Sequence, residues 1–423
     1  MVSLSKFKKQ GKNFGIYLSA SLIPMALSLI TNPWIAKNLP PVDYAIIGYY
    51  QGFNTLLTPF INFYLLHYYT KRFFETNDTE REELRSTIFK SLIYFSLVLS
   101  IIAIGGLYIY TEIFNKGSQI SFFPYAIISV MSLPVVGIYS LSLTDLRMQR
   151  RSWDFFKLSV SNGLLVTVVT LFFVVIFKWG AIGKLSATLL ATSIVFIYLL
   201  IKHRNMFAIP FNRAIFITSI KFCFPLVIAA MLTFFSSGYE KVVLERMGDL
   251  VEMGYYVVGA TIAGYIGVFS TSINDTFQPD VFQSIVKKDF RRCFKVISAK
   301  IALISIIVIV FIATAPFVID ILTAGRYMNS VDYAQIVAIS SITSMLYYSF
   351  SQVTIAMGYT SITLTNKIIG SILSVIAYTV LINKYGATGA AWGVVLSYLF
   401  FFIGNVILVI IKKKLHVTRN IKH

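Results

Sequence analysis

The chain has 423 residues, of which 57% are hydrophobic and only 13% are charged, and its mean hydropathy is +0.74. About 25% of the residues of a soluble protein are charged, so this composition excludes a soluble globular protein and indicates an integral membrane protein. The formal net charge of +19 comes from short basic clusters between apolar segments. It therefore does not indicate binding to nucleic acid.

Apolar segments of about 20 to 24 residues recur along the whole chain. At a rise of about 1.5 Å per residue, each is long enough to cross the hydrocarbon core of a bilayer, about 30 Å thick, as an α-helix. We therefore predict an all-α, multi-pass membrane protein. Its twelve transmembrane helices are expected at about 13–36, 44–68, 86–110, 120–143, 155–177, 184–202, 215–238, 254–275, 296–320, 334–356, 362–382 and 389–411.

The charge distribution predicts the orientation of these helices. With twelve helices both termini lie on one side of the membrane, and 29 of the 37 Lys and Arg residues fall in or next to the segments on that side. Basic loops resist translocation, so this side is expected to be cytoplasmic. The only cysteines, Cys223 and Cys293, suggest neither a disulfide framework nor a metal site, and no nucleotide-binding P-loop occurs. No metal or cofactor is expected.

Two motifs that recur within the sequence predict an internal duplication. Lys-Trp-Gly-Ala-Ile-Gly at 178–183 is echoed by Lys-Tyr-Gly-Ala-Thr-Gly at 384–389, and Gly-Tyr-Tyr at 48–50 recurs at 254–256, both with an offset of 206 residues. The glycines of the longer motif suit tight interhelical turns. We expect two six-helix lobes, residues 1–207 and 208–423. Because six is even, both lobes enter the membrane in the same direction, as a parallel repeat.

Several further segments carry a family resemblance. They are Asn-Leu-Pro-Pro-Val-Asp-Tyr at 38–44, Lys-Phe-Cys-Phe-Pro-Leu at 221–226, Glu-Lys at 240–241 and Met-Gly-Tyr-Tyr at 253–256. Together with the two Gly-rich turns, they resemble the Wzx-type O-antigen flippases, in the polysaccharide-export branch of the multidrug/oligosaccharidyl-lipid/polysaccharide exporter superfamily. The first segment departs from the family pattern, because Pro40 replaces a glycine and Ala45 follows the tyrosine.

This resemblance implies two lobes around a central cavity that opens alternately to each side of a bacterial plasma membrane. The implied substrate is an undecaprenyl-diphosphate-linked oligosaccharide, which passes from the cytoplasmic to the periplasmic leaflet for O-antigen, capsule or exopolysaccharide synthesis. The implied partners are this lipid-linked glycan, the bilayer, a polysaccharide polymerase and a chain-length regulator. A flippase makes and breaks no covalent bond, so the protein is not expected to be an enzyme.

Polar side chains within the spans are the candidate substrate-binding residues, because a charge at the bilayer centre costs about 2.5–3.5 kcal/mol on insertion scales. Lys367, in span 11, and Lys221, at the start of span 7, either meet a substrate phosphate or extend to the membrane interface. Gln51, Asn54 and Asn62 in span 2 either form interhelical hydrogen bonds or line a stripe that faces the sugar.

Four residues are candidates for gating. Pro24 and Pro225 lie in the first helix of each predicted half, where each removes a backbone hydrogen bond and can kink its helix. Glu240 and Lys241, near the outer end of span 7, either form an ion pair that closes the lobes or are solvated at the interface.

The alternative function is a cation-coupled multidrug exporter of the same superfamily. Such coupling usually uses an acidic residue within a helix, and span 1 contains neither Asp nor Glu. Asp145, Asp275 and Asp280 are predicted to lie at or beyond the inner ends of their helices, where a carboxylate is readily solvated. A flippase is therefore the favoured interpretation. A peptidoglycan-precursor flippase, typically of fourteen helices, fits the twelve predicted spans less well.

Overall fold

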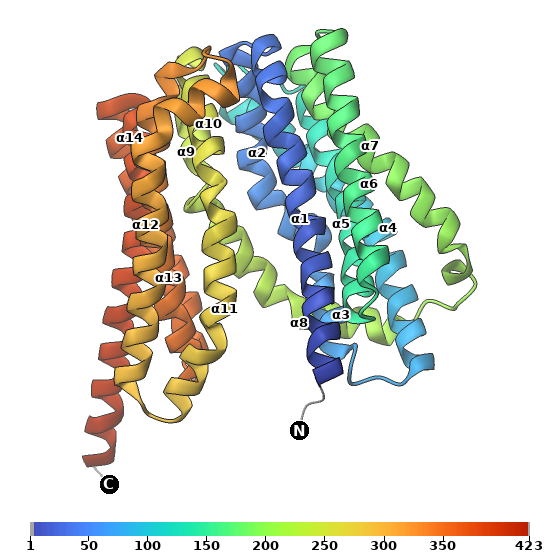
Figure 1. The fold of residues 1–423 in the computed structure, drawn as a ribbon, viewed down its shortest axis with the longest axis vertical. Coiled ribbons are helices and arrows are strands. Elements are labelled where there is room, and N and C mark those ends of the chain that lie inside the picture. The colour runs from blue at the N-terminus through green and yellow to red at the C-terminus, as the bar shows by residue number, and fades with distance from the viewer. Residues whose placement is uncertain (1–3, 422–423) are drawn as a thin grey trace. The chain divides into compact units, whose positions relative to one another are not determined.

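The computed structural model describes the backbone of residues 4–421 and the side chains of residues 15–359 and 362–412. Nearly all of this described part is helical, and no β-strand occurs in it. Contacts within the chain divide it into two compact units, Met1–Met231 (unit 1) and Leu232–His423 (unit 2) (Figure 1). The prediction that the duplicated lobes meet between residues 207 and 208 stays a prediction.

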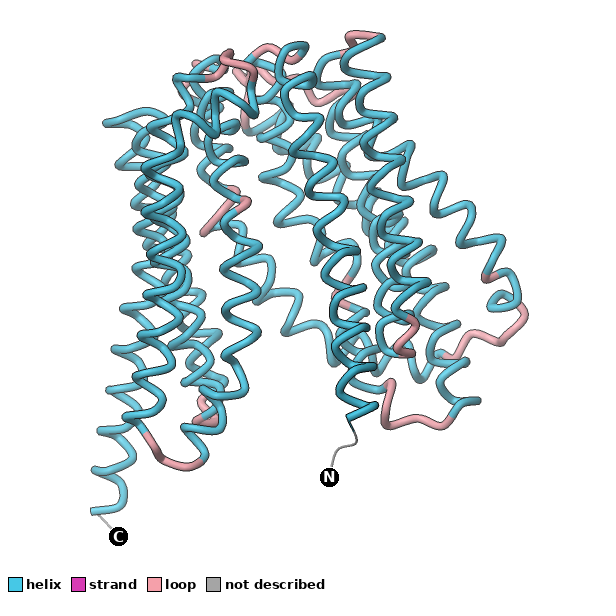
Figure 2. Tube along the Cα trace, in the orientation of Figure 1, coloured by secondary structure: helices cyan, strands magenta, loops and turns pink. Residues whose placement is uncertain are grey.

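Unit 1 is a bundle of antiparallel helices (Figure 2). Within it α1 packs against α6, α5 packs against both α4 and α7, and α2 packs against α5. A methyl group added at Gly163 of α6 would lie 2.7 Å from Cβ of Pro24, so α1 and α6 approach closely there. The elements are α1 (Leu4–Asn38), α2 (Pro41–Asn62), α3 (Leu65–Arg72), α4 (Asp78–Tyr108), the π-helical η1 (Ile109–Phe114), α5 (Tyr125–Met148), α6 (Ser152–Thr170), the π-helical η2 (Leu171–Ile176), α7 (Gly180–Lys202), the 3₁₀ turn η3 (Arg204–Phe207) and α8 (Arg213–Met231).

Unit 2 is built in the same way from long helices. Within it α13 packs against α10, α11, α12 and α14. The last helix is broken at Gly386, where φ is 56° and ψ is −135°, so it is two helices in sequence. The elements are the 3₁₀ turn η4 (Leu232–Phe235), α9 (Tyr239–Arg246), α10 (Leu250–Gly264), α11 (Ile266–Val286), α12 (Phe290–Thr323), the 3₁₀ turn η5 (Met328–Ser330), α13 (Val331–Ala356) and α14 (Thr360–Ile421).

The predicted membrane-spanning architecture is confirmed. Of the described helices, nine segments are long and apolar enough to cross a membrane, and the last of them, Ile362–Lys412, contains the break at Gly386. The more polar helices α2 and α13, of 22 and 26 residues, are also long enough to cross. Counting these two, and both halves of the broken segment, gives the twelve spans that the sequence predicts.

Both predicted Gly-rich turns have the same backbone geometry. Gly180 and Gly386 have φ values of +58° and +56°, a left-handed conformation that glycine adopts without strain. A methyl group at Gly183 would lie 3.0 Å from the carbonyl oxygen of Phe173, and one at Gly389 would lie 2.0 Å from that of Leu381. In each turn the second glycine thus lets one helix begin directly against the end of the preceding one. This equivalence supports the parallel repeat.

A carboxylate lies next to each turn. Asp43, in the first turn of α2, accepts a hydrogen bond from the backbone N–H of Ala181, and its Oδ2 is 2.5 Å from where a Cβ of Gly180 would lie. In unit 2, a Cβ added at Gly386 would lie 3.4 Å from Oε1 of Glu252, which is in the first turn of α10. In each unit, a carboxylate from the first turn of a helix therefore lies next to the Gly-rich turn.

Candidate functional site

One side of α2 carries a row of polar side chains. Gln51, Asn54, Thr55 and Thr58 have the spacing i, i+3, i+4 and i+7, which places them on one helical face. Gln51 and Thr55 are exposed. Asn54 donates to Oγ of Ser129 on α5 at 3.0 Å and accepts from the same hydroxyl at 3.2 Å. We call these four residues the α2 polar face.

Asn62 has a different position. Its side chain is buried, and Nδ2 donates to the backbone oxygen of Leu133 on α5 at 3.3 Å. A methyl group at Gly137 would lie 2.0 Å from its Oδ1, so the absence of a side chain there makes room for this amide. Of the three predicted span 2 residues, Asn54 and Asn62 therefore make interhelical hydrogen bonds, whereas Gln51 is exposed.

A second polar row lies on α11. Thr271, Asn274, Asp275 and Gln278 have the same i, i+3, i+4 and i+7 spacing, and all except the half-buried Asn274 are exposed. They lie within the candidate membrane span Leu250–Val286. Polar side chains at membrane depth face protein or water rather than lipid. This α11 polar face is therefore suited to contact water or a polar ligand.

A buried lysine lies behind the α11 polar face. Lys300 of α12 is 0% exposed, and its Nζ donates to Oδ1 of Asn274 at 2.8 Å and to Oε1 of Gln352, on α13, at 3.0 Å. Among the described side chains, no ion pair includes Lys300. Amide oxygens orient an ammonium group without neutralising it, so a positive charge is held inside unit 2, bonded to a residue of the α11 polar face.

The sequence does not distinguish Lys300, because this residue lies near the start of an apolar segment, where it counts among the basic residues of the cytoplasmic side. The available signal was a set of three polar residues, one near the same end of each of three neighbouring spans: Asn274, Lys300 and Gln352. Their convergence depends on which faces of α11, α12 and α13 meet.

Lys367, which the sequence did single out, points into the helix bundle of unit 2. Its Nζ donates to Oγ1 of Thr233 at 3.3 Å, and it lines a cavity of about 30 Å³ together with Tyr347, Tyr348 and Tyr398. A cavity of this size holds about one water molecule. Lys221, in contrast, is exposed on α8. A role for either lysine in substrate binding stays a prediction.

The gating candidates lie in contrasting environments. Pro24 packs against α6, as described above, whereas Pro225 is exposed on α8. Glu240 is only 2% exposed and pairs with Lys241, with 3.0 Å between Oε1 and Nζ. Its carboxylate is therefore buried within unit 2 rather than solvated at an interface. Gating by these four residues stays a prediction.

Three acidic residues lie where the sequence did not predict them. Asp275 and Asp280 were expected at or beyond the end of their helix, but α11 continues to Val286, so both lie within it and Asp275 is in mid-helix. Asp145 is 1% exposed rather than solvated. It forms an ion pair with Arg85, with 2.6 Å between Oδ2 and Nη2, and its Oδ1 accepts from Tyr69 at 2.6 Å and from Gln149 at 2.8 Å.

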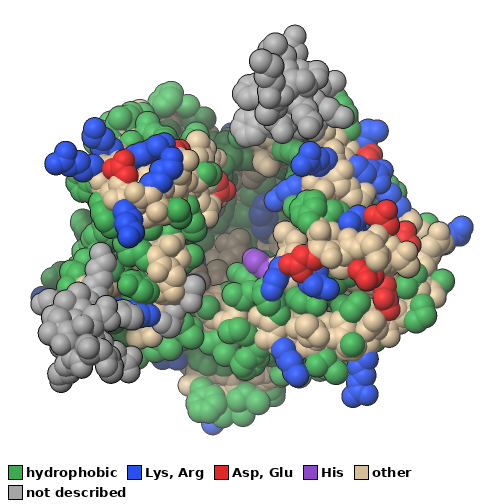
Figure 3. All heavy atoms as spheres, turned by 90° about the horizontal axis from the view of Figure 1, so that it is seen from below, with side chains coloured by type: hydrophobic (Ala, Val, Ile, Leu, Met, Phe, Trp, Pro, Cys, Tyr) green, Lys and Arg blue, Asp and Glu red, His purple; other side chains and the backbone are tan. Residues whose placement is uncertain are grey.

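This Asp145 network joins α3, α4 and α5 at the end of unit 1 where α7 also terminates. Figure 3 shows that end at the right of the view, with Lys and Arg side chains next to Asp and Glu side chains. Nη2 of Arg85 also lies 3.4 Å from Nδ1 of His203, just beyond α7. Burial, reinforced by the positive charges of Arg85 and Lys202, lowers the pKa of His203 to about 4. His203 is therefore neutral at pH 7 and accepts from the guanidinium group.

We expect acid to weaken the folded state through His203. Its pKa is about 4 in the folded chain and about 6.5 when unfolded. The unfolded state therefore binds a proton first, and the stabilisation is complete above about pH 6.5 and is lost as the pH falls toward 4. The thermal midpoint of the wild type should fall between pH 7 and pH 5, and that of His203→Gln should fall less. Equal falls would contradict this assignment.

Metal binding receives no support from the described residues, which contain no group of three or more His, Cys, Asp or Glu side chains suited to hold an ion.

Comparisons with known proteins identify the family of the chain and proteins of similar fold. Residues 10–283 match the model of a family described as polysaccharide biosynthesis protein. No curated protein matches the sequence.

Among solved structures, the chain is similar to an inward-facing multidrug resistance MATE family transporter of the MOP superfamily, at 14% identity and a TM-score of 0.69, covering 94% of this chain and 99% of that one. It is also similar to the lipid II flippase MurJ in an inward closed conformation, at 14% identity and a TM-score of 0.71, covering 92% and 86%. A MOP superfamily transporter from Pyrococcus furiosus gives 12% identity and a TM-score of 0.60, covering 94% and 93%. At these identities the similarity shows the fold alone.

Proposed function

Since the chain belongs to the polysaccharide biosynthesis protein family and its fold is similar to those of solved transporters, we propose that it is not an enzyme but a flippase for an undecaprenyl-diphosphate-linked oligosaccharide. In this proposal the substrate moves from the cytoplasmic to the outer leaflet of a bacterial plasma membrane by alternating access, and both termini of the protein are cytoplasmic. The observation that carries the proposal is the buried Lys300 behind the exposed α11 polar face, whose ammonium group is held by amide oxygens and forms no ion pair among the described side chains.

The chemistry of the substrate explains why such a cation is useful. A diphosphate diester carries about two negative charges, and an unpaired charge is very costly to move through a low-dielectric layer. Lys300, and Lys367 in the same unit, supply positive charge at membrane depth. In the same unit, the exposed Thr271 and Gln278 of the α11 polar face supply hydroxyl and amide groups that can hydrogen-bond to sugars. A membrane potential that is negative inside assists outward movement by about 2.3 kcal/mol per charge per 100 mV.

A cation-coupled multidrug exporter is the second candidate function. It is favoured by Asp275, an exposed carboxylate in mid-helix of α11, within the candidate membrane span Leu250–Val286. The similarity to MATE transporters agrees with it as well as with a flippase. Asp145 is a weaker candidate for cation coupling, because Arg85, Tyr69 and Gln149 already occupy its oxygens.

Deletion of the gene separates these two functions. We expect lipid-linked repeat units to accumulate on the inner leaflet, while sensitivity to cationic drugs stays unchanged. The measurement is the amount of lipid-linked glycan in the deletion strain, in the strain complemented with the wild type and in one complemented with Asp275→Asn. Normal glycan display together with raised drug sensitivity would support the exporter and refute the flippase.

A further inference from the structure

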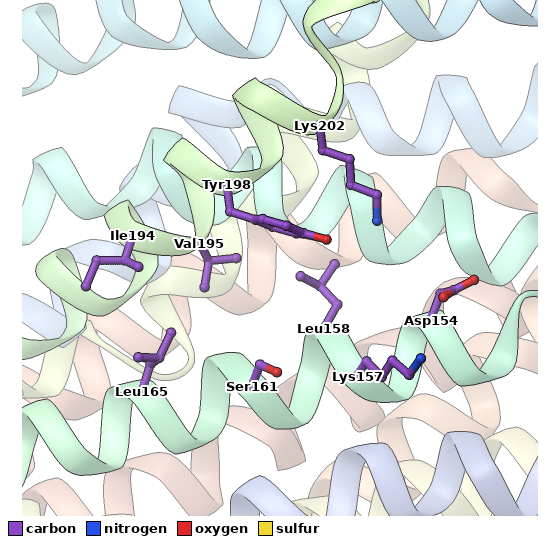
Figure 4. Close-up of a pocket in the computed structure, with 9 residues that line it drawn as sticks. All are labelled: Asp154, Lys157, Leu158, Ser161, Leu165, Ile194, Val195, Tyr198 and Lys202. Carbon is purple, nitrogen blue, oxygen red and sulfur yellow. The ribbon is translucent and has the colours of Figure 1, made fainter.

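A groove separate from the polar faces runs between α6 and α7 in unit 1 (Figure 4). Its volume is about 340 Å³, within the range of ligand pockets. Polar groups line one part of it, and the aliphatic side chains of Leu165, Ile194 and Val195 line the other. The groove is therefore amphipathic along its length.

The polar part lies at the predicted cytoplasmic surface of the membrane. α6 begins at Ser152 and α7 ends at Lys202, so Lys157 and Lys202 lie at the same end of the two antiparallel helices. Leu165 lies eight residues further along α6, about 12 Å deeper at 1.5 Å per residue. Trp153 and Tyr198 are 55% and 53% exposed at the polar end, as expected for aromatic residues at a membrane interface.

The charges at the polar end leave two cations available. The carboxylate of Asp154 is engaged by Arg151, with 2.8 Å between Oδ2 and Nη2. Lys157 takes part in none of the ion pairs of the described side chains, and neither does Lys202, whose Nζ lies 5.4 Å from the centre of the Tyr198 ring. Figure 4 shows both lysine side chains at the same end of the groove. Two ammonium groups above an aliphatic channel complement an anionic headgroup with an acyl chain.

We propose that this groove binds one anionic phospholipid of the surrounding membrane, with its phosphate between Lys157 and Lys202 and an acyl chain along Leu165, Ile194 and Val195. Ser161, which is exposed in the groove between these two parts, is placed to hydrogen-bond to the glycerol ester region. Basic pockets between helices on the cytoplasmic side are suited to such lipids. The proposal does not depend on the transported substrate.

Native mass spectrometry of the purified full chain, titrated with phosphatidylglycerol or phosphatidylcholine, tests this site. The wild type should bind one phosphatidylglycerol in preference to phosphatidylcholine. Lys157→Gln/Lys202→Gln should bind it about 30-fold more weakly, which corresponds to about 1 kcal/mol for each lysine near the surface. The matched control is Lys287→Gln/Lys295→Gln, which removes two exposed lysines of unit 2 and should stay within about twofold of the wild type.

A second variant tests the groove without changing its charge. Ser161→Trp should fill the groove and abolish the preference for phosphatidylglycerol, whereas excess inorganic phosphate should not displace the lipid from the wild type. Unchanged binding in the double lysine variant or in Ser161→Trp would overturn the proposal. So would an equal loss in the control pair or displacement by inorganic phosphate.

Discussion

Lys300→Met is expected to lower glycan export by roughly tenfold to a hundredfold while changing the stability of the protein little. The loss in export corresponds to about 1.5–3 kcal/mol, the contribution of a hydrogen bond to a charged group. Stability should change little, because removing the desolvation cost of a buried charge is opposed by the cost of leaving the amide oxygens of Asn274 and Gln352 without this donor. Export of lipid-linked glycan and the thermal midpoint are measured in parallel, and Lys300→Arg should retain more export than Lys300→Met.

Lys90→Met is the matched control for this prediction. Lys90 is also a lysine in a membrane-spanning helix and is 8% exposed, but its ammonium group is bonded to the backbone oxygens of Phe207 and Ile209, beyond α7. Its loss should lower stability through the lost attachment of this segment and should not affect export in the folded fraction. Wild-type export by well-folded Lys300→Met would show that Lys300 has no part in transport.

Asp145→Ala is expected to have the largest effect on stability. It removes one partner of a buried ion pair and leaves Arg85 uncompensated, a change that typically costs about 3–5 kcal/mol. The side chain of Arg85 is 23% exposed and can gain water, so we expect the lower end of this range. Asp145→Asn should be less damaging, because its side-chain oxygen can still accept a hydrogen bond from Tyr69.

The control for Asp145 is Asp280→Ala. Asp280 pairs with Arg292 at 3.0 Å, but the two side chains are 42% and 46% exposed, and surface pairs of this kind contribute less than about 1 kcal/mol. Thermal midpoints of the two variants in the same detergent provide the measurement. Similar midpoints for Asp145→Ala and Asp280→Ala would contradict the structural role of the Asp145 network.

The sequence predicted the helical architecture because length and hydropathy are properties of single segments. The glycines of both turns were also predictable, since the left-handed conformations at Gly180 and Gly386 depend on local backbone geometry. Helix ends were less predictable. Span 8 was expected to end at residue 275, whereas α11 continues to Val286, and this difference places Asp275 within the helix.

The candidate site was only partly predictable, because burial depends on which faces of several helices meet. The hydropathy pattern shows only that Asp145 lies near a helix end. Its contacts with Arg85, Tyr69 and Gln149 form only when α3, α4 and α5 pack together. Lys300 likewise becomes distinctive only through its contacts with α11 and α13. Gln51 could be chosen from the sequence, since the face of a single helix follows from residue spacing.

Transport by purified protein in proteoliposomes tests the central claim most directly. The substrate is a fluorescent undecaprenyl-diphosphate-linked oligosaccharide, and a membrane-impermeant quencher reports the leaflet in which it lies. We predict that the wild type moves the labelled glycan between leaflets and that Lys300→Met does so at least about tenfold more slowly, given the lost charge interaction. Extrusion of a cationic dye by the wild type, with no movement of the lipid-linked glycan, would contradict the account and identify a drug exporter.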